Sequence, residues 1–559
     1  MSKKKKNPVL NPSEVILYIF QIFVSLYCVI FFIAMPLFYH NKYYDIGDFK
    51  YNLFMYLTVT FLSLSFIILL IYISVRFKEG KFSLDTVKNL PKNMSVLDWF
   101  VLAFGVASIL SFLFSPNRTN EYPTFFLFKS AEETSVVNLP WEGYNGWNMG
   151  LRSQLMFVAI YFLVSRLFQK SWKKDLLYII LSSSFIVYLL GVLHRFHIDP
   201  LGLYEGLNEY YISKFLSTLG QSTWYSSFMI VILPIGMAFY IYNDAKGSVS
   251  NILLTIYITI GAATFVTQNS DSAYPAFAAI IAVMFASSFT SNERFLNFFE
   301  MLLVMLGAMK ITGFFQFLFP QRLTELDSLS TFISGSPVTL ILFIIMICIY
   351  VFLKKAVNNN KFDITRYTKL RNIIIILIIA LIPTVIIIGY LNTKGLLPTN
   401  AFQNVEYLTF NDQWGNNRGF TWRTTIEAMK EPSYRKMMLT GPGPDCYATV
   451  LYASDLRSAQ LYSFWNGEVI VCAHNEWLNM LFNEGIIGFI SYFGIFATGF
   501  ILFIRKCNNP VLLAGSASII GYVLHNFFCY QQILCTPMIF FIIALCEMFR
   551  KTSLQKSKE

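Results

Sequence analysis

Charged residues are scarce in this chain. Only 13% of its 559 residues are Asp, Glu, Lys or Arg, whereas roughly a quarter of the residues of a soluble protein are charged. Apolar residues make up 55% of the chain and aromatic residues 17%. Apolar runs of about 20 residues recur from end to end, and each can cross a hydrocarbon core of ~30 Å as a helix. The composition therefore excludes a soluble globular protein and predicts an integral membrane protein.

Several functional signatures are missing. The eight cysteines show no CxxC or His-linked spacing, so neither a zinc site nor a redox motif is predicted. The net charge of +11 is not gathered on one soluble module, which argues against nucleic acid as a partner. The first apolar run is too long for a cleaved signal core, and no small-residue cleavage pattern follows it. Cys446 and Cys472 have two open interpretations, a disulfide in an oxidising compartment or two small buried hydrophobes.

The chain does contain fourteen apolar segments. Helices are predicted for all of them, because lipid-facing strands leave backbone groups unpaired. The expected fold is an all-α polytopic membrane protein with about fourteen transmembrane helices, divided into a transmembrane region 1–391 with eleven spans, an extracytoplasmic loop 392–484, and 485–559 with three further spans and a tail. The predicted spans are 14–38, 51–75, 97–115, 151–168, 175–197, 222–242, 251–267, 272–289, 295–319, 334–353, 371–391, 485–504, 510–527 and 532–549.

Basic residues orient these helices. The run Lys3-Lys4-Lys5-Lys6 precedes the first span, and alternation from a cytoplasmic N-terminus places the basic segments 76–92, 166–174, 354–371 and 550–558 on that same side. Both termini are therefore predicted to be cytoplasmic. The long polar loop then lies on the outer face of the cell membrane, and the lipid bilayer is the first partner of the chain.

The outer loop carries most of the polar motifs, and a loop of its length is uncommon unless it is functional. Arg418 and Trp422 share one face of a predicted helix that opens near Thr421, whereas Arg423 points about 100° away. Gly441-Pro442-Gly443-Pro444 predicts a turn, because proline fixes φ and glycine tolerates positive φ. A second helix is predicted to start near His474-Asn475.

These residue types suit one chemistry. Arg418 and Arg423 offer planar guanidinium forks that match a diphosphate leaving group in a partly dehydrated place. A neutral imidazole at His474 can take the proton of an attacking hydroxyl, or it can donate a hydrogen bond to the diphosphate. A backbone-bonded histidine at a helix start is the structural alternative.

Outside the loop, candidate residues are few. Trp147 belongs to an outer segment in which aromatics either anchor the membrane interface or stack on sugars. Arg195 closes the fifth span on the outer side and either snorkels or contacts a ligand. Lys310 lies inside an apolar run, where a charge costs ~2.5 kcal/mol or more unless it faces protein or water. We expect a partner for Lys310, with a carboxylate as the candidate.

The Arg-x-x-x-Trp helix, the Gly-Pro-Gly turn and His474-Asn475 followed by Gly485 and Gly488 resemble the O-antigen ligase and polysaccharide polymerase (Wzy-type) superfamily. The resemblance is sharpest over 418–490 and fainter at 220–234. It implies a membrane-embedded glycosyltransferase of the C type that needs no metal or other cofactor. Its substrates would be an undecaprenyl-diphosphate-linked oligosaccharide and an acceptor glycan, and other polysaccharide-assembly membrane proteins would be further partners.

The resemblance assigns roles to residues in the matching motifs. His474 and Arg418 would be catalytic, and Arg423, Trp422, Asn475, Gly441 and Gly443 would bind substrate together with Arg195 and Lys310. One departure stands out, because Ser270-Asp271 occupies a short outer turn where the family often carries Ser-Arg. An acidic residue cannot hold a diphosphate. Arg195, Lys310 or Arg322 would have to supply the cation, unless the donor is held differently or this turn does not correspond to the family's.

Two functions within the family stay open. A polymerase joins repeat units on undecaprenyl diphosphate, whereas a ligase passes the finished chain to a lipid, protein or wall acceptor. The low alanine content and the abundance of Phe, Ile, Lys and Asn, typical of an AT-rich genome, favour the polymerase. A flippase or transporter of lipid-linked oligosaccharides is the alternative of another class. Transporters usually show two similar halves and midplane charges, and this sequence shows no internal repeat.

Overall fold

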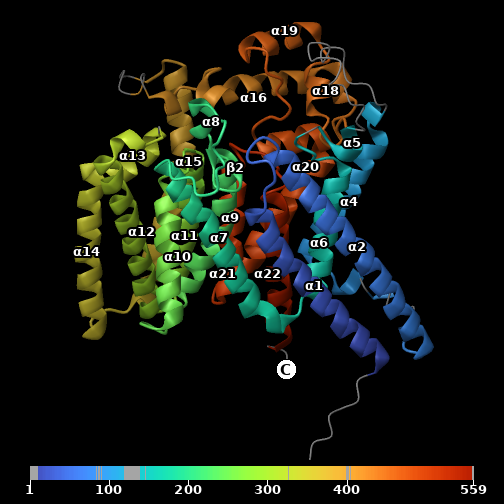
Figure 1. The fold of residues 1–559 in the computed structure, drawn as a ribbon, viewed down its shortest axis with the longest axis horizontal. Coiled ribbons are helices and arrows are strands. Elements are labelled where there is room, and N and C mark those ends of the chain that lie inside the picture. The colour runs from blue at the N-terminus through green and yellow to red at the C-terminus, as the bar shows by residue number, and fades with distance from the viewer. Residues whose placement is uncertain are drawn as a thin grey trace, which may run out of the picture.

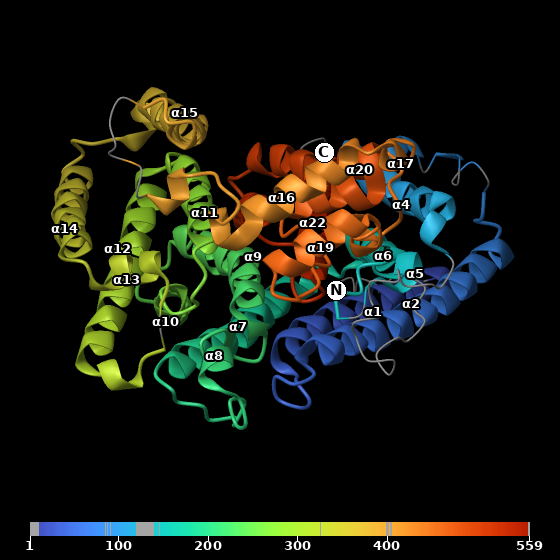
Figure 2. The same ribbon diagram turned by 90° about the horizontal axis from the view of Figure 1, so that it is seen from above.

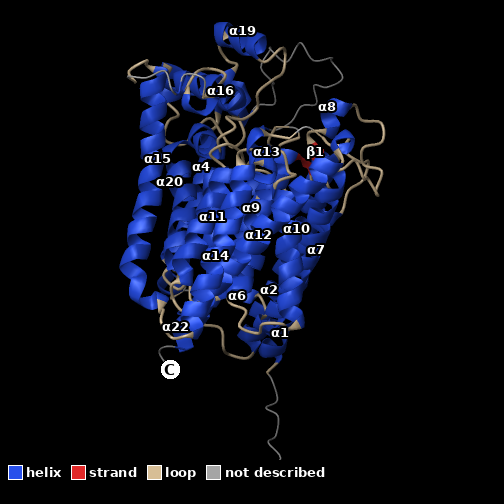
Figure 3. Ribbon diagram, turned by 90° about the vertical axis from the view of Figure 1, so that its left-hand side faces the viewer, coloured by secondary structure: helices blue, strands red, loops and turns tan. Residues whose placement is uncertain are grey.

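The computed structural model describes residues 11–556 apart from 84, 86–87, 90, 119–138, 145, 325, 398–401 and 403–404. Regular structure in this part is almost entirely helical (Figure 3). Each predicted span coincides with one helix, which confirms the all-α polytopic fold. These helices are α1 (Pro12–Leu37), α2 (Ile46–Lys78), α4 (Val96–Phe114), α6 (Leu151–Leu167), α7 (Lys173–Arg195), α9 (Ser222–Ile241), α10 (Val249–Phe265), α11 (Ala273–Ser288), α12 (Asn292–Leu318), α14 (Pro337–Asn358), α15 (Thr368–Thr393), α20 (Glu476–Ile504), α21 (Pro510–His525) and α22 (Thr536–Lys556).

These helices run side by side (Figure 1). Among the described helices, nine are long and apolar enough to cross a membrane by length and composition. The apolar helices α10, α11 and α21 are shorter, at 16 or 17 residues. The C-terminal end of the chain lies at the lower end of the bundle in Figure 1, and most of the short helices gather at the upper end. The chain is thus a multi-pass membrane protein with one elaborated face.

The bundle has a packed centre and a loose edge. The most apolar window of α9 is 89% buried, as expected for a helix that is apolar on all sides. In contrast, the corresponding window is 0% buried in α14 and 6% buried in α15. Seen from above, these two helices stand at the margin of the molecule (Figure 2). Their Ile and Leu side chains are therefore available to lipid.

Short elements form the elaborated face. A buried cluster that includes Phe420, Tyr434, Tyr447 and Phe482 gives the 414–482 segment a core of its own. The rings of Phe420 and Phe464 stack with centroids 3.9 Å apart. The short elements over the whole chain are η1 (Pro91–Asn93), η2 (Pro116–Arg118), α5 (Leu139–Glu142), η5 (Lys170–Trp172), α8 (Glu209–Ile212), β1 (Phe215–Leu216), β2 (Gly220–Gln221), η6 (Pro320–Arg322), α13 (Ser328–Gly335), η7 (Ile364–Tyr367), η9 (Glu406–Leu408), α16 (Trp414–Lys430), α17 (Pro432–Arg435), α18 (Tyr447–Leu451) and α19 (Asp455–Phe464); β1 and β2 pair antiparallel.

Two expected pairings differ from the structure. Lys310 has no carboxylate partner among the described residues; its ammonium donates to the carbonyl oxygens of Ser334 at 3.0 Å and Ser336 at 2.8 Å, and to the Thr339 hydroxyl at 2.8 Å. The lysine thus satisfies carbonyls at the junction of α13 and α14, which carry partial negative charge. Cys446 and Cys472 are both buried free thiols, so the hydrophobe interpretation holds and the bridge does not.

Candidate active site

The site begins at an irregular turn near the start of α16. Gly415, Asn416 and Asn417 all have positive φ, a conformation that glycine and asparagine tolerate best. Regular helical geometry therefore starts at Arg418, three residues earlier than the sequence predicted. Gly419 packs so tightly that a Cβ would overlap the carbonyl oxygen of Asn411. This close approach fixes the direction in which α16 leaves the turn.

Arg418 points from α16 into the protein. One terminal nitrogen donates to the carbonyl oxygen of Gly415 at 2.5 Å and the other donates to that of Phe528 at 2.8 Å. Its Nε is buried without a hydrogen-bond partner. No carboxylate pairs with Arg418 among the described residues, and burial lowers the pKa of the guanidinium. The site thus contains a cation whose charge is not compensated.

His474 lies close enough to Arg418 to feel its charge. Its backbone has a φ of 48°, and its ring meets that of Tyr530 edge-on with centroids 5.4 Å apart. Nδ1 lies 3.3 Å from the carbonyl oxygen of Cys472, whereas Nε2 makes no hydrogen bond with the described residues. Burial and, less strongly, the Arg418 charge lower the pKa of His474 to about 4. The imidazole is therefore neutral near pH 7.

Trp422 ties the two segments together. Its indole N–H donates to the carbonyl oxygen of Ala473 at 3.0 Å, so α16 holds the residue that precedes His474. Its ring stacks near Phe528 with centroids 6.4 Å apart and meets Trp414 at 5.5 Å. All three aromatic side chains are only partly buried. They form an aromatic wall beside His474.

Sequence reasoning missed the loop between α21 and α22. Tyr530 contacts His474, and its hydroxyl accepts a hydrogen bond from the Trp224 indole at 2.9 Å. Trp147 meets the Tyr530 ring with centroids 4.2 Å apart. Trp147 therefore reaches the site and does not merely anchor an interface. The only sequence signal was the polar pair Gln531-Gln532 between two apolar runs.

The Gly-Pro-Gly turn supports the site from behind. Gly441 and Gly443 have φ values of 72° and 123°, and a Cβ on Gly441 would overlap the carbonyl of Asn483. α20 bends beside this turn at Gly485, and the predicted span 485–504 is the part of the helix after the bend. The carbonyl of Asn483 accepts from the Gly443 N–H at 3.1 Å. Both glycines therefore act through backbone packing.

Asp445, which directly follows Pro444, holds a second segment in place. Its buried carboxylate accepts hydrogen bonds from the N–H groups of Tyr144 at 2.8 Å and Met149 at 3.1 Å. These two residues flank Trp147, so Asp445 fixes the turn that carries the tryptophan to the site. Burial raises the pKa of Asp445 to about 7.

Three predicted ligands are engaged elsewhere. Arg423 is exposed and pairs with Asp412 at 2.8 Å and Glu427 at 3.1 Å. The Asn475 side chain caps α20 by accepting the Leu478 N–H at 3.0 Å. Arg195 is 3% exposed and interacts electrostatically with Asp327. Only Arg418, Trp422 and His474 of the nine predicted residues meet at one place, with Gly441 and Gly443 behind them.

Asp271 lies next to Asp327, the carboxylate that interacts with Arg195. It accepts a hydrogen bond from the Tyr407 hydroxyl, and burial together with a hydrogen bond to Asp271 raises the pKa of Asp327 to about 7. The short outer turn is therefore built as an acidic contact between α11, α13 and η9.

One known family pattern covers the stretch of sequence that contains Arg418 and His474. The sequence pattern of a family described as O-antigen ligase matches residues 323–493, which include Arg418, Trp422 and His474. This region belongs to the O-antigen ligase superfamily. Members of the family are glycosyltransferase-like ligases that act on a lipid-linked oligosaccharide and an acceptor. No curated protein matches the chain. The match ends at residue 493, inside α20. It therefore does not reach Tyr530, whose contact with His474 is seen in the structure.

Proposed function

We propose that this chain transfers a glycan from undecaprenyl diphosphate to an acceptor hydroxyl at the outer face of the cytoplasmic membrane, with polymerisation of repeat units as the favoured reaction. One observation carries this proposal: the half-buried Arg418, with its Nε fully buried and no carboxylate partner among the described residues, lies beside a histidine whose Nε2 makes no hydrogen bond with those residues. Burying an uncompensated charge is costly, so such a cation suits an anionic ligand.

The proposed chemistry assigns one step to each residue. The bond between the anomeric carbon and the phosphate oxygen breaks, and Arg418 stabilises the negative charge that develops on the diphosphate. The acceptor oxygen forms the new glycosidic bond, and its proton passes to Nε2 of His474. A hydrogen bond from Nδ1–H to the carbonyl of Cys472 selects the tautomer with a free Nε2 lone pair. This contact favours the base role over donation to the diphosphate.

Donor binding would also tune the base. In the free protein the Arg418 charge contributes to the low pKa of His474. A diphosphate bound to Arg418 cancels that charge and adds negative charge nearby, both of which raise the pKa of the imidazole towards neutrality. A base with a pKa closer to the working pH is a better catalyst. Binding of the donor thus prepares the residue that activates the acceptor.

The proposal narrows the ligand contacts. The ligand contacts that the proposal keeps are Arg418, His474 and Trp422. The sugar rings would pack on the aromatic wall formed by Trp414, Trp422 and Phe528. Each other predicted ligand has the structural role described above. The mechanism uses no metal, and glycan transfer by the purified protein should continue in EDTA; loss of transfer on chelation would contradict it.

A gel of the surface glycan distinguishes polymerase from ligase. If the protein is a polymerase, a strain without its gene should lose long chains and keep single repeats. If it is a ligase, the strain should lose both forms from the acceptor. The second outcome supports the alternative function, transfer of the finished chain to a lipid, protein or wall acceptor. Loss of the surface glycan with lipid-linked oligosaccharide accumulating on the inner side of the membrane indicates a flippase.

The outer location is tested by labelling. Single cysteines introduced at 360 and 555 should be protected from a membrane-impermeant thiol reagent, and one at 410 should react. Among the natural cysteines, Cys348 of α14 is exposed, and the others are buried or half-buried. The labelling experiment therefore uses a Cys348→Ser protein as its starting background. Reaction at 360 from outside would overturn the topology and the proposed face of the site.

A further inference from the structure

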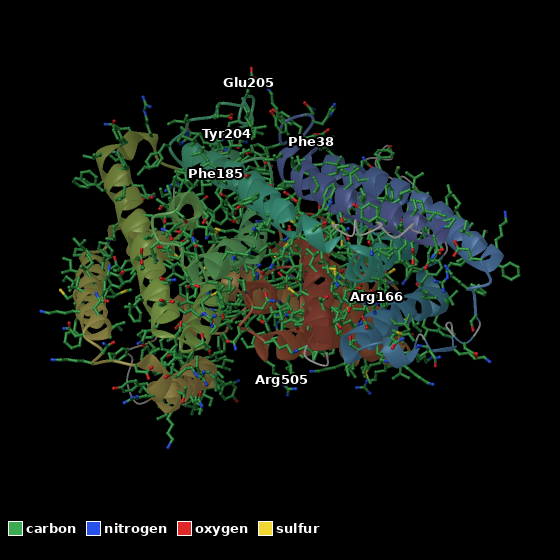
Figure 4. All side chains as sticks on the ribbon, turned by 90° about the horizontal axis from the view of Figure 1, so that it is seen from below. Phe38, Arg166, Phe185, Tyr204, Glu205 and Arg505 are labelled. Atoms are coloured by element: carbon green, nitrogen blue, oxygen red, sulfur yellow. The ribbon has the colours of Figure 1, made fainter. Side chains whose placement is uncertain are left out.

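A groove between α7, α9 and α10 opens at the opposite end of the bundle from His474. It has a volume of about 550 Å³, within the roughly 300–1,000 Å³ range of ligand pockets. Figure 4 views this end of the molecule, with Phe185 of α7 labelled. The wall is mainly apolar and includes Leu177, Leu181 and Phe185 from α7 and Leu253 from α10.

The length of the groove matches one leaflet. Its lining residues on α7 extend from Lys173 to Ile186, which corresponds to about 20 Å of helix. Half of a hydrocarbon core of ~30 Å is ~15 Å thick, so a groove of this length runs from the interface to just past the midplane. An acyl chain of one leaflet has this reach.

The mouth of the groove is positively charged. Lys173 and Lys174 line it, with the polar side chains of Asn243 and Ser250 beside them. The ammonium of Lys173 lies 5.1 Å from the Phe549 ring centroid, and in the described part of the chain neither lysine forms an ion pair with a carboxylate. The neighbouring acids Asp175 and Asp244 do not line the groove.

Two helix N-termini add to this charge. α7 begins at Lys173 and α10 begins at Val249, so both helices direct their partial positive ends to the mouth. A smaller cavity of about 60 Å³ shares Lys173, Leu177 and Phe239 with the groove and reaches α22 at Ile542 and Cys546. The groove therefore continues between α7 and α9 towards the buried centre of the bundle.

We propose that this groove binds an anionic diacyl phospholipid of the cytoplasmic leaflet. The phosphate contacts Lys173 and Lys174, and one acyl chain lies along α7. Basic pockets between transmembrane helices on the cytoplasmic side suit such headgroups. The polyprenyl donor is a poorer occupant, because its diphosphate is proposed to lie at the opposite face. The exclusion of the polyprenyl donor rests on the proposed function, whereas the charge and length of the groove do not.

Lipid retention tests the proposal. The wild type is purified from nanodiscs of one part phosphatidylglycerol to three parts phosphatidylcholine, and retained lipid is counted by native mass spectrometry. The double variant Lys173→Gln/Lys174→Gln should retain about tenfold less phosphatidylglycerol. The matched control is Lys354→Gln/Lys355→Gln, which removes the same charge at the cytoplasmic end of α14 without touching the groove. It should retain lipid within twofold of the wild type.

A second variant tests the apolar wall of the groove independently of the two lysines. Leu181→Trp fills the apolar wall and leaves both lysines, so it should also lose the bound phosphatidylglycerol. Lys173→Arg/Lys174→Arg keeps the charge and should retain lipid, which guards against misfolding of the glutamine variant. Equal retention in the Lys173/Lys174 and Lys354/Lys355 glutamine variants, equal retention of phosphatidylcholine by the wild type, or full retention in Leu181→Trp would each overturn the proposal. So would preferential retention of undecaprenyl phosphate added to the nanodiscs.

Discussion

The two faces of α16 place chemically identical side chains in opposite surroundings. On the inward face, Arg418 is half-buried, with its Nε fully buried; it donates to the carbonyl oxygens of Gly415 and Phe528 and has no carboxylate partner in the described part of the chain. On the outward face, five residues later, Arg423 is exposed and held by Asp412 and Glu427. Hydrogen bonds to these two acids raise the pKa of Arg423, whereas burial lowers that of Arg418. Only the inward arginine gains from an incoming anion.

Under the proposed function, this difference separates a cation that binds the diphosphate from one that has a structural role. Exposed ion pairs contribute about 0–1 kcal/mol because water screens them, so Arg423 adds little to stability or ligand binding. A buried guanidinium that only carbonyls satisfy loses more solvation than it recovers, and a diphosphate would recover it through bidentate contacts. Substitutions of Arg418 on the inward face therefore test the chemistry, and substitutions of Arg423 on the outward face serve as controls.

The largest effect is expected at Arg418. Arg418→Ala should lower glycan transfer from purified undecaprenyl-diphosphate donor by about 10³-fold, and Arg418→Lys should be nearly as inactive, because an ammonium cannot make the planar bidentate contact. Size-exclusion chromatography should show that both variants fold and insert. Wild-type turnover in the lysine variant would reduce Arg418 to a structural role.

His474 is expected to give the next largest effect. His474→Ala should lower turnover by about 10²-fold while donor binding persists, because the base acts in the transition state. His474→Gln can form hydrogen bonds but cannot take a proton near pH 7, so it should be as poor as alanine. Turnover and donor affinity are measured separately. High activity in the glutamine variant would show that the imidazole only donates to the diphosphate.

The pH profile distinguishes free from donor-bound protein. Since the pKa of His474 is lowered to about 4, kcat/KM should stay constant on acidification until pH approaches 4, where the base becomes protonated. In kcat, which reports the donor complex, the acidic limb should lie at higher pH. A kcat/KM limb near the ordinary histidine value of 6.5 would mean that the imidazole is not shielded from water.

The sequence predicted these residues unevenly, for physical reasons. Hydropathy placed each span, because a lipid environment leaves few alternatives to an apolar helix. The i, i+4 spacing put Arg418 and Trp422 on one face, and the structure confirms this and the separation from Arg423. The sequence predicted a carboxylate partner for Lys310, whereas its partners are backbone carbonyls. Carbonyls left free at a helix end cannot be recognised in a sequence. Tyr530 was missed because its contact with His474 depends on a loop 56 positions further along the chain.

A smaller effect is expected at Asp445, behind the inward face. Asp445→Ala leaves the Tyr144 and Met149 N–H groups unsatisfied and forces alanine into positive φ, which should cost about 2–4 kcal/mol. Asparagine accepts the same bonds and tolerates this backbone. Thermal unfolding in detergent measures both variants.

The pH dependence at Asp445 has a defined sign. Its pKa in the folded protein, about 7, lies above the value of 3.8 expected when it is unfolded, so its contribution is complete below about pH 4 and is lost as the pH rises through 7. Relative to the wild type, Asp445→Asn should therefore be more stable at pH 8 than at pH 5. A constant difference would show that the carboxyl group is not buried as described.

The smallest effect is expected on the outward face, at Arg423. Arg423→Gln removes two exposed ion pairs worth together about 1 kcal/mol or less and leaves Arg418, Trp422 and His474 in place. Turnover should remain within about twofold of the wild type, with no change in donor affinity. The assay is run at low and high salt, because screening would weaken a direct contact between an exposed arginine and the diphosphate. A loss of tenfold or more at low salt that shrinks at high salt would place Arg423 on the ligand and remove the distinction between the two faces of α16. A loss independent of salt, accompanied by weaker thermal stability, would instead mean that the Asp412 pair holds the turn from which Arg418 starts.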